Sequence, residues 1–191
     1  MDRDFWERHW RTPGSSLPAH PYLDREISGL EPGTALDAGC GEGAEAIRLA
    51  AAGWRVTGVD ISATALTAAA ARAADAGVHV EWVRGDLTTW EPGAPVDLVL
   101  SSYAHAEIPQ LDLVARIAGW VAPGGTLLVV AHGPEDAHAA AGATATAAGI
   151  AGALPSGKGT IETADEVERE IVHGHDATTL RDVVVRARRA G

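Results

Sequence analysis

The 191-residue sequence has one cysteine, fewer basic than acidic residues and no long hydrophobic run. A single cysteine, Cys40, excludes an internal disulfide bond and a cysteine-rich metal site. The 26 acidic and 15 basic residues give a formal net charge of -11. Such a surface repels phosphate backbones, and the basic segment 181–189 is too short to reverse the balance, so we expect no nucleic-acid partner.

The absence of long hydrophobic runs is evidence on the cellular location of the protein. Residues 1–11 are charged and contain no apolar signal core. Charged, glycine or proline residues interrupt each later apolar run before it reaches membrane-spanning length, so we expect a cytoplasmic protein with no membrane partner. Hydrophobic residues make up 46% of the chain, which is enough for one domain with a sizeable core.

From residue 34 onward, strand-like and helix-like segments alternate. Apolar runs predict strands at residues 34–37, 54–59, 78–83, 96–100 and 126–131. Helices are expected at residues 44–52, from the N-cap Ser62 to Ala76, and on a face formed by Leu111, Val114, Ile117, Ala118 and Val121. This alternation predicts parallel βαβ units with right-handed crossovers, hence an α/β fold of the doubly wound, Rossmann-like type.

The two ends of the chain have other patterns. Helices over residues 4–10, ending at Pro13-Gly14, and over residues 19–28 would form an N-terminal helical cover, residues 1–30. Residues 137–153 are rich in small side chains and are expected to form a loose helix or a mobile cover.

The C-terminal segment favours an antiparallel hairpin. Residues 166–172 alternate as an edge strand would, although the capping-box spacing of Thr163 and Glu166 also allows a helix. A turn at His173-Gly-His-Asp176 and a last strand over 179–187 would complete a hairpin, residues 160–191. We therefore expect a seven-stranded, mostly parallel sheet in a single domain, residues 1–191.

The strongest chemical signal is the segment Leu36-Asp-Ala-Gly-Cys-Gly-Glu-Gly43, between the first strand and the first helix. Glycines adopt positive φ and let the backbone approach a ligand, and open α/β sheets bind nucleotides at this turn. Asp60 ends the second strand 21 residues beyond Gly39, where an acid accepts hydrogen bonds from a ribose. The alternatives are a turn without a ligand and a helix cap, although Ser62 can provide the cap.

Two further polar positions follow the next strands. After the third strand, Asp86 can accept from an adenine amino group while Leu87 packs on the ring; a plain turn residue is the alternative for Asp86. Residues 97–102 place a polar loop at the end of the fourth strand, across the topological switch point from the first.

Over residues 34–132, the order and spacing of these elements resemble the class I S-adenosylmethionine-dependent methyltransferases. The resemblance implies S-adenosylmethionine as cofactor and residues 34–132 as the cofactor-binding core. It implies that the methionine part is bound by Asp37, Gly39, Cys40 and Gly41, and that Ser101 lies near its amino group. It also implies that Asp60 binds the ribose, that Asp86 and Leu87 bind the adenine, and that Ile61 is a further cofactor-binding residue.

The N-terminal Trp-Glu-Arg-His-Trp segment is similar to the start of small thiopurine- and tellurite-resistance-type methyltransferases. This likeness implies that Trp6 and Trp10, which share a helix face, cover the cofactor; packing anchors are the alternative. No Asn-Pro-Pro-Tyr-like motif follows the fourth strand, so the branch that methylates nucleic-acid and protein-glutamine nitrogen is not expected.

Methyl transfer is an in-line displacement, for which an enzyme aligns the acceptor and, where needed, removes its proton. His105, after the fourth strand, is the candidate base and Tyr103 a polar or stacking contact, although His105 could instead position the acceptor or cap its loop. His132, at the end of the fifth strand, is a second candidate. His173 and His175 lack a third ligand, so we expect no metal site.

The chain has little beyond its core with which to grip a polymer, so we expect a small-molecule acceptor with an O, N or S nucleophile. The oligomeric state stays open, with a homodimer as one option. A nicotinamide-dependent oxidoreductase is a competing function, but the loop is Gly-x-Gly-x-Gly rather than Gly-x-Gly-x-x-Gly. A non-catalytic S-adenosylmethionine-binding module is another, in which Tyr103 and the tryptophans would fill the acceptor space.

Overall fold

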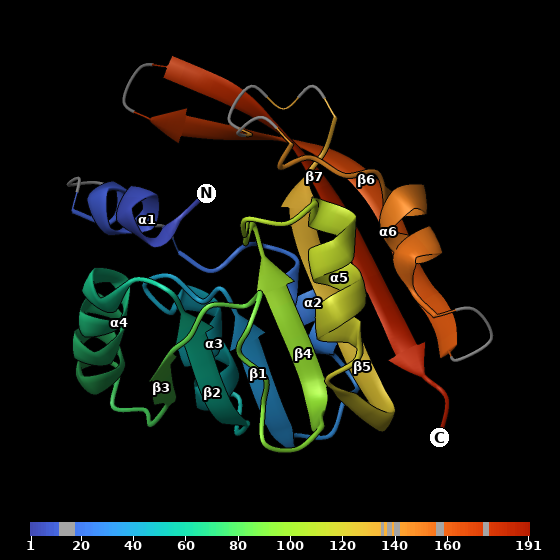
Figure 1. The fold of residues 1–191 in the computed structure, drawn as a ribbon, viewed down its shortest axis with the longest axis horizontal. Helices are drawn as coiled ribbons and strands as arrows, with labels where there is room; N and C mark the ends of the chain where they lie inside the picture. The colour runs from blue at the N-terminus through green and yellow to red at the C-terminus, as the bar shows by residue number, and fades with distance from the viewer. Residues whose placement is uncertain (12–17, 135, 137–138, 140–141, 156–158, 174–175) are drawn as a thin grey trace.

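In the computed structural model, one seven-stranded sheet runs through the molecule in the order β3-β2-β1-β4-β5-β7-β6 (Figure 1). The structure describes the chain except residues 12–17, 135, 137–138, 140–141, 156–158 and 174–175. The strands are β1 Thr34–Ala38, β2 Arg55–Asp60, β3 Glu81–Arg84, β4 Val96–Ser102, β5 Val121–His132, β6 Gly159–His173 and β7 Asp176–Arg189. Neighbours among β1 to β5 pair in parallel, and β7 is antiparallel to both β5 and β6. The predicted doubly wound sheet with an antiparallel C-terminal hairpin is confirmed.

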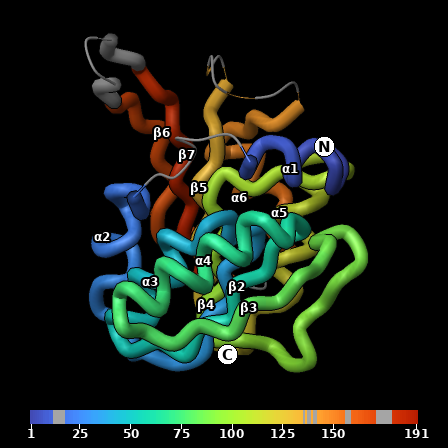
Figure 2. Tube along the Cα trace, turned by 90° about the vertical axis from the view of Figure 1, so that its left-hand side faces the viewer, coloured from blue at the N-terminus to red at the C-terminus, as the bar shows by residue number. Residues whose placement is uncertain are grey.

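Helices cover both faces of the sheet. In Figure 1, α5 (Gln110–Ala118) and α6 (Ala147–Ala153) lie in front of it, and α2 (Leu23–Ile27) and α3 (Ala44–Ala51) lie behind. The long helix α4 (Ala63–Asp75) packs on α3, β2 and β3. Figures 1 and 2 place α1 (Arg3–His9) at the end of the sheet where β1 and β4 finish.

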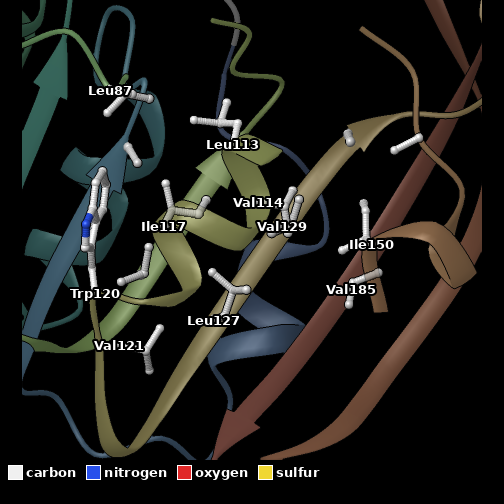
Figure 3. Packing of buried hydrophobic residues seen from close by; sticks show 14 of the residues in the cluster. Leu87, Leu113, Val114, Ile117, Trp120, Val121, Leu127, Val129, Ile150 and Val185 are labelled. Atoms are coloured by element: carbon white, nitrogen blue, oxygen red, sulfur yellow. The ribbon is translucent and has the colours of Figure 1, made fainter. Parts of the chain in front are cut away.

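The central strands are apolar on both sides because both faces are buried. In β4, Val99 belongs to the core under α5, whereas Leu98 and Leu100 belong to the core against α2 and α3. Figure 3 shows the α5 side, where leucine and isoleucine side chains of the helix lie over those of β5. This two-sided burial holds the carboxyl ends of β1, β2 and β4 at one edge, where the polar residues follow.

Several predicted boundaries were wrong. Val121 was expected on the helix face, but it pairs with Val96 in parallel as the first residue of β5, and α5 ends at the C-cap Gly119. Of the strand predicted over 78–83, only the part from Glu81 onward pairs with a neighbouring strand, because β3 begins at that residue. The helix predicted over 19–28 begins at Leu23, since Pro21 disfavours a helical residue before it.

The C-terminal alternatives are decided by contacts with other elements. Residues 166–172 form part of strand β6 and not a helix. The two capping-box residues bind elsewhere: Thr163 Oγ1 donates to Glu26 Oε2 at 3.0 Å, and Glu166 Oε1 accepts from the Ala147 backbone at 3.0 Å. Helix α6 covers only the last part of the segment predicted over 137–153.

Some predicted features lie outside the described residues, namely the helix end at Pro13-Gly14 and the central Gly174-His175 of the hairpin turn. No helix in the described part of the chain is both long and apolar enough to cross a bilayer.

Candidate functional site

The glycine-rich loop after β1 is held tightly between neighbouring segments. The backbone N–H groups of Gly39 and Cys40 both donate to the Val59 carbonyl, at 2.8 and 3.0 Å, which anchors the loop to β2. Gly39 and Gly41 have φ of 80° and 50°. A Cβ on Gly39 would lie 2.4 Å from the Ala104 Cβ, and one on Gly41 would lie 2.7 Å from the Trp10 ring. Both positions therefore require glycine.

Asp60, at the end of β2, faces this loop as predicted. Its Oδ2 accepts from the Gly41 backbone N–H at 2.8 Å, and its Oδ1 accepts from the Ser62 N–H at 2.8 Å. Burial raises the pKa of this carboxyl, and the two backbone bonds oppose the shift. Ser62 Oγ accepts from the Ala65 N–H at 3.2 Å, so Ser62 provides the predicted cap of α4.

Two more carboxyl groups are buried next to the loop. Asp37 Oδ2 has no hydrogen-bond partner among the described residues. Burial raises the pKa of Asp37 well above its ordinary value, and the charges of Glu45 and Asp60 add to the shift. Burial likewise raises the pKa of Glu45. A buried acceptor without a donor, among acids that resist ionisation, suits a ligand that brings ammonium and hydroxyl donors.

The remaining predicted cofactor positions fall into two groups. Leu87 is buried beside Gly39, and Ser101 is buried near the end of β4. Burial raises the pKa of the Cys40 thiol, which suits a packing role in the loop. Asp86 differs, because its Oδ1 accepts from the Thr88 N–H and Oγ1 at 2.9 and 2.7 Å. Its carboxylate is engaged by its own turn, which was the alternative prediction.

Helix α1 lies against the glycine-rich loop and is held there by side-chain contacts. Glu7 accepts from the Ala63 N–H at 2.9 Å and from Thr64 Oγ1 at 2.7 Å, which docks α1 on the N-terminus of α4. The Thr64 hydroxyl is the main reason that the pKa of Glu7 is lowered to about 2. Trp10 lies on Gly41, as noted, and Trp6 stacks on His105 with 6.4 Å between ring centroids. Both tryptophans of α1 thus pack next to the glycine-rich loop and the residues after β4, and their covering of a cofactor stays a prediction.

Two surface hollows flank α1. One, of about 430 Å³, is lined by arginines of α1, by Arg84 and by the start of α4. The other, of about 380 Å³, is lined by His105, Gln110 and the segment between them, together with Met1 and residues 142–143. Neither of these two hollows is lined by Gly41 or Asp60.

His105 is held in one orientation beside the second hollow. Gln110 Nε2 donates to the Ala104 carbonyl at 3.1 Å, so its Oε1 is the atom that accepts from His105 Nδ1 at 3.2 Å. This arrangement leaves His105 Nε2 as a proton acceptor. Burial lowers the pKa of His105, which favours the neutral imidazole near pH 7.

Tyr103 is half-buried next to His132 in a strained conformation, with φ of 51°. Burial raises the pKa of its phenol well above the ordinary range, and its hydroxyl accepts from Arg169 Nη2 at 3.3 Å. Tyr103 is therefore a hydrogen-bonding side chain and not a base. Asp182, buried on β7, accepts from Arg169 Nε at 2.5 Å and from the Tyr22 hydroxyl at 2.9 Å.

His132 is the second histidine in this part of the site, next to His105 and Tyr103. Its Nδ1 lies 2.9 Å from Oδ2 of Asp136, whose side chain is fully buried. Its ring lies 5.6 Å from that of His105, at an interplanar angle of 25°, and 4.8 Å from that of Tyr103. Sequence reasoning ranked His132 below His105 and missed Asp136. The available signal was the spacing of four residues just past a strand end.

Within the described residues, no three His, Cys, Asp or Glu side chains are grouped so as to hold a metal ion. His175 of the predicted histidine pair lies outside those residues.

Comparisons with known proteins point to one family. Residues 35–125 match the family of methyltransferase domains. Uncharacterized methyltransferases of Mycobacterium bovis and Mycobacterium tuberculosis are 45% identical over 98 residues, which are 50% of this chain and 48% of theirs. A trans-aconitate 2-methyltransferase of Streptomyces avermitilis is 35% identical over 137 residues, covering 67% of this chain and 48% of that protein. The match spans about half the length of these curated relatives.

A solved structure extends the likeness to the whole fold. The N-methyltransferase NodS from Bradyrhizobium japonicum, in complex with S-adenosyl-L-homocysteine, has a TM-score of 0.72 at 19% identity. The alignment covers 99% of this chain and 98% of that one. At this identity the likeness shows the shared fold, with the C-terminal hairpin included.

Proposed function

Residues 35–125 form a methyltransferase domain on the class I, S-adenosylmethionine-dependent fold, and from this premise we propose that the protein transfers a methyl group from S-adenosylmethionine to a small-molecule acceptor. The observation that carries the proposal is the buried Asp60 carboxylate, bonded to the Gly41 backbone at the glycine loop. It lies beside Asp37, whose Oδ2 has no partner within the described part of the chain. A nicotinamide dinucleotide offers less to these acids, because it lacks the sulfonium and the amino-acid ammonium.

The residues around the loop suit S-adenosylmethionine. We assign the methionine part to Asp37, Gly39, Cys40 and Gly41, and its ammonium also to Ser101. We assign the ribose to Asp60, and the adenine to Leu87, with Asp86 holding the turn beside it. Ile61, next to Asp60, would be a further cofactor contact. When bound, this cofactor supplies an electrophilic methyl group on a sulfonium sulfur. The buried carboxyl groups would become ionised beside its positive charges, and Trp6 and Trp10 on α1 would exclude water.

Two features support a small acceptor. The net charge of -11 opposes a polyanionic substrate. The relative from Streptomyces avermitilis is named for a small acid, trans-aconitate. On the acceptor side, we assign to the neutral His105 a hydrogen bond that orients the acceptor through Nε2, with Gln110 fixing its tautomer. Tyr103 would position the acceptor.

The test of the cofactor begins with calorimetry of S-adenosylmethionine against NAD. Wild-type protein should bind the first, and Asp60→Asn should weaken that binding about tenfold or more, because a charged hydrogen-bond acceptor is lost. Asp75→Asn, an exposed change at the end of α4, is the matched control and should leave the affinity unchanged. Equal affinity of wild type and Asp60→Asn would contradict the proposed site, and preferential NAD binding would favour the oxidoreductase.

The test of turnover is S-adenosylhomocysteine release in a screen of thiols, phenols, amines, carboxylic acids and an RNA fragment. Release with a small molecule and not with the RNA supports the proposal. Binding of S-adenosylmethionine without release for any acceptor would instead identify a non-catalytic binding module.

A further inference from the structure

The His132–Asp136 pair has the geometry of an oriented proton acceptor. With Nδ1 2.9 Å from a fully buried carboxylate, the imidazole is held as the Nδ1–H tautomer and turns Nε2 toward other partners. A carboxylate in this position also stabilises the imidazolium that forms when Nε2 takes a proton. His132 is the last residue of β5, where it pairs with Asp182 of β7.

The acceptor side of the site, where His105 and His132 lie, has two groups that can accept a proton. His105 and His132 both commit Nδ1 to a neighbour, Gln110 and Asp136, so the stacked rings offer two Nε2 lone pairs. Arg169 reaches this side, but its guanidinium is already bound by Asp182 and Tyr103. A carboxylate acceptor calls for positive charge, whereas two imidazole acceptors suit a molecule that brings hydroxyl protons.

We propose that His132, positioned by Asp136, is the general base of the methyl transfer and that the acceptor is a phenol-type hydroxyl. This inference rests on the proposed function and names its substrate class. The acceptor oxygen forms a bond to the methyl carbon, and the carbon–sulfur bond breaks with its electron pair left on sulfur. The hydroxyl proton passes to His132 Nε2, and water later removes it from the imidazolium.

Phenols fit this site better than aliphatic alcohols for two reasons. A phenol has a pKa near 10, as tyrosine does, so an imidazole can remove its proton as the new bond forms; an aliphatic hydroxyl is much too weak an acid. The surroundings are also aromatic. Trp6, His105 and His132 stack in succession, with interplanar angles of 21° and 25°, and an aromatic acceptor finds ring partners there.

Several charged or titratable groups surround His132 and bear on its proton transfer. They are Asp136 after β5, Asp182 opposite it on β7, His105 and Tyr103 after β4, Arg169 on β6, and the Met1 amino group near His105. Asp136 hydrogen-bonds directly to the ring, so it is the positioning residue to test.

The decisive experiment compares His132→Gln with wild type on phenols of graded acidity. With an ordinary phenol, kcat/KM should fall by about 10²–10⁴ in the variant. With an acidic nitrophenol, which is already ionised at assay pH, the loss should be much smaller because no proton is removed. His79→Gln, an exposed change, is the control and should behave as wild type with both.

The effect of Asp136→Asn on the His132 tautomer is measured without enzyme turnover. In the cofactor-free protein, ¹⁵N NMR should show His132 as the Nδ1–H tautomer, and the Asn amide should shift the population toward Nε2–H. If Asp136→Asn does not fold, the wild-type tautomer and the His132→Gln series still decide the matter.

Equal losses on both phenols, no loss in His132→Gln, or an Nε2–H tautomer in wild type would overturn the inference. The same holds if thiols or carboxylates are methylated and phenols are not, an outcome that leaves the proposed function intact. Failure of the proposed function is separate, since it appears as absent S-adenosylmethionine binding.

Discussion

Asp37, Glu45 and Asp60 place three carboxyl groups around one glycine loop, and burial raises the pKa of each. Burying three carboxyl groups together lowers the stability of a folded protein unless a ligand supplies positive charge and hydrogen-bond donors to them. Asp37 is the most informative residue of the three, because its Oδ2 has no partner in the described structure.

The raised pKa of Asp37 makes stability depend on pH. From its ordinary value of 3.8 up to the raised native value, the native state holds a proton that the unfolded chain has released. The free energy of unfolding contributed by this group is therefore full below pH 3.8 and is lost as pH rises through that window. Asp37→Asn should raise Tm at pH 8 in the absence of cofactor, and the gain should vanish near the lower end of the window.

This pH prediction is checked by thermal unfolding of both proteins at several pH values. Addition of S-adenosylmethionine should reverse the ranking at pH 8, because the ionised Asp37 then has a cationic partner. A variant that is equally destabilised at every pH would show that Asp37 is only a structural hydrogen-bond acceptor.

At the scale of elements, α1 has seven residues and is too short to be stable alone. Its position comes from contacts with other elements: Glu7 caps α4, Trp10 packs on Gly41 and Trp6 stacks on His105. The helix that covers the glycine-rich loop is thus held by a few side-chain contacts.

Glu7→Gln should loosen α1 selectively. Loss of a charged acceptor at the α4 N-terminus should make amide hydrogen exchange in residues 3–9 about tenfold faster. Exchange in α3 should not change, and Asp4→Asn, in the first turn of α1, is the matched control. Unchanged exchange in Glu7→Gln would mean that the tryptophans alone hold the helix.

At the scale of the whole molecule, a buried polar network ties the C-terminal hairpin to the site. Asp182 on β7 binds Tyr22, before α2, and Arg169 on β6, which in turn reaches Tyr103 after β4. Residues more than 100 positions apart in sequence thereby support the acceptor side together.

Asp182→Ala should destabilise the protein by about 3 kcal/mol in urea unfolding, because it leaves a partly buried guanidinium and a buried phenol unpaired. Glu168→Ala removes an exposed ion pair with Arg181 and should cost under about 1 kcal/mol. Similar effects of the two substitutions would mean that water replaces the buried carboxylate.

Much of this protein follows from local sequence. Alternating apolar runs and glycine turns were enough to predict the doubly wound sheet, because hydrophobic periodicity and turn chemistry act over a few residues. The glycine loop and Asp60 were predictable for the same reason, since both follow strand ends that must lie at one edge of a parallel sheet.

The tertiary structure decided what depends on contacts between distant segments. It ended α5 before Val121 through pairing with Val96, and it made residues 166–172 a strand. It also brought His132 to His105 and Arg169 to Tyr103, which no periodicity could indicate. Side-chain partners across a fold are set by packing, and packing is not a local property of the chain.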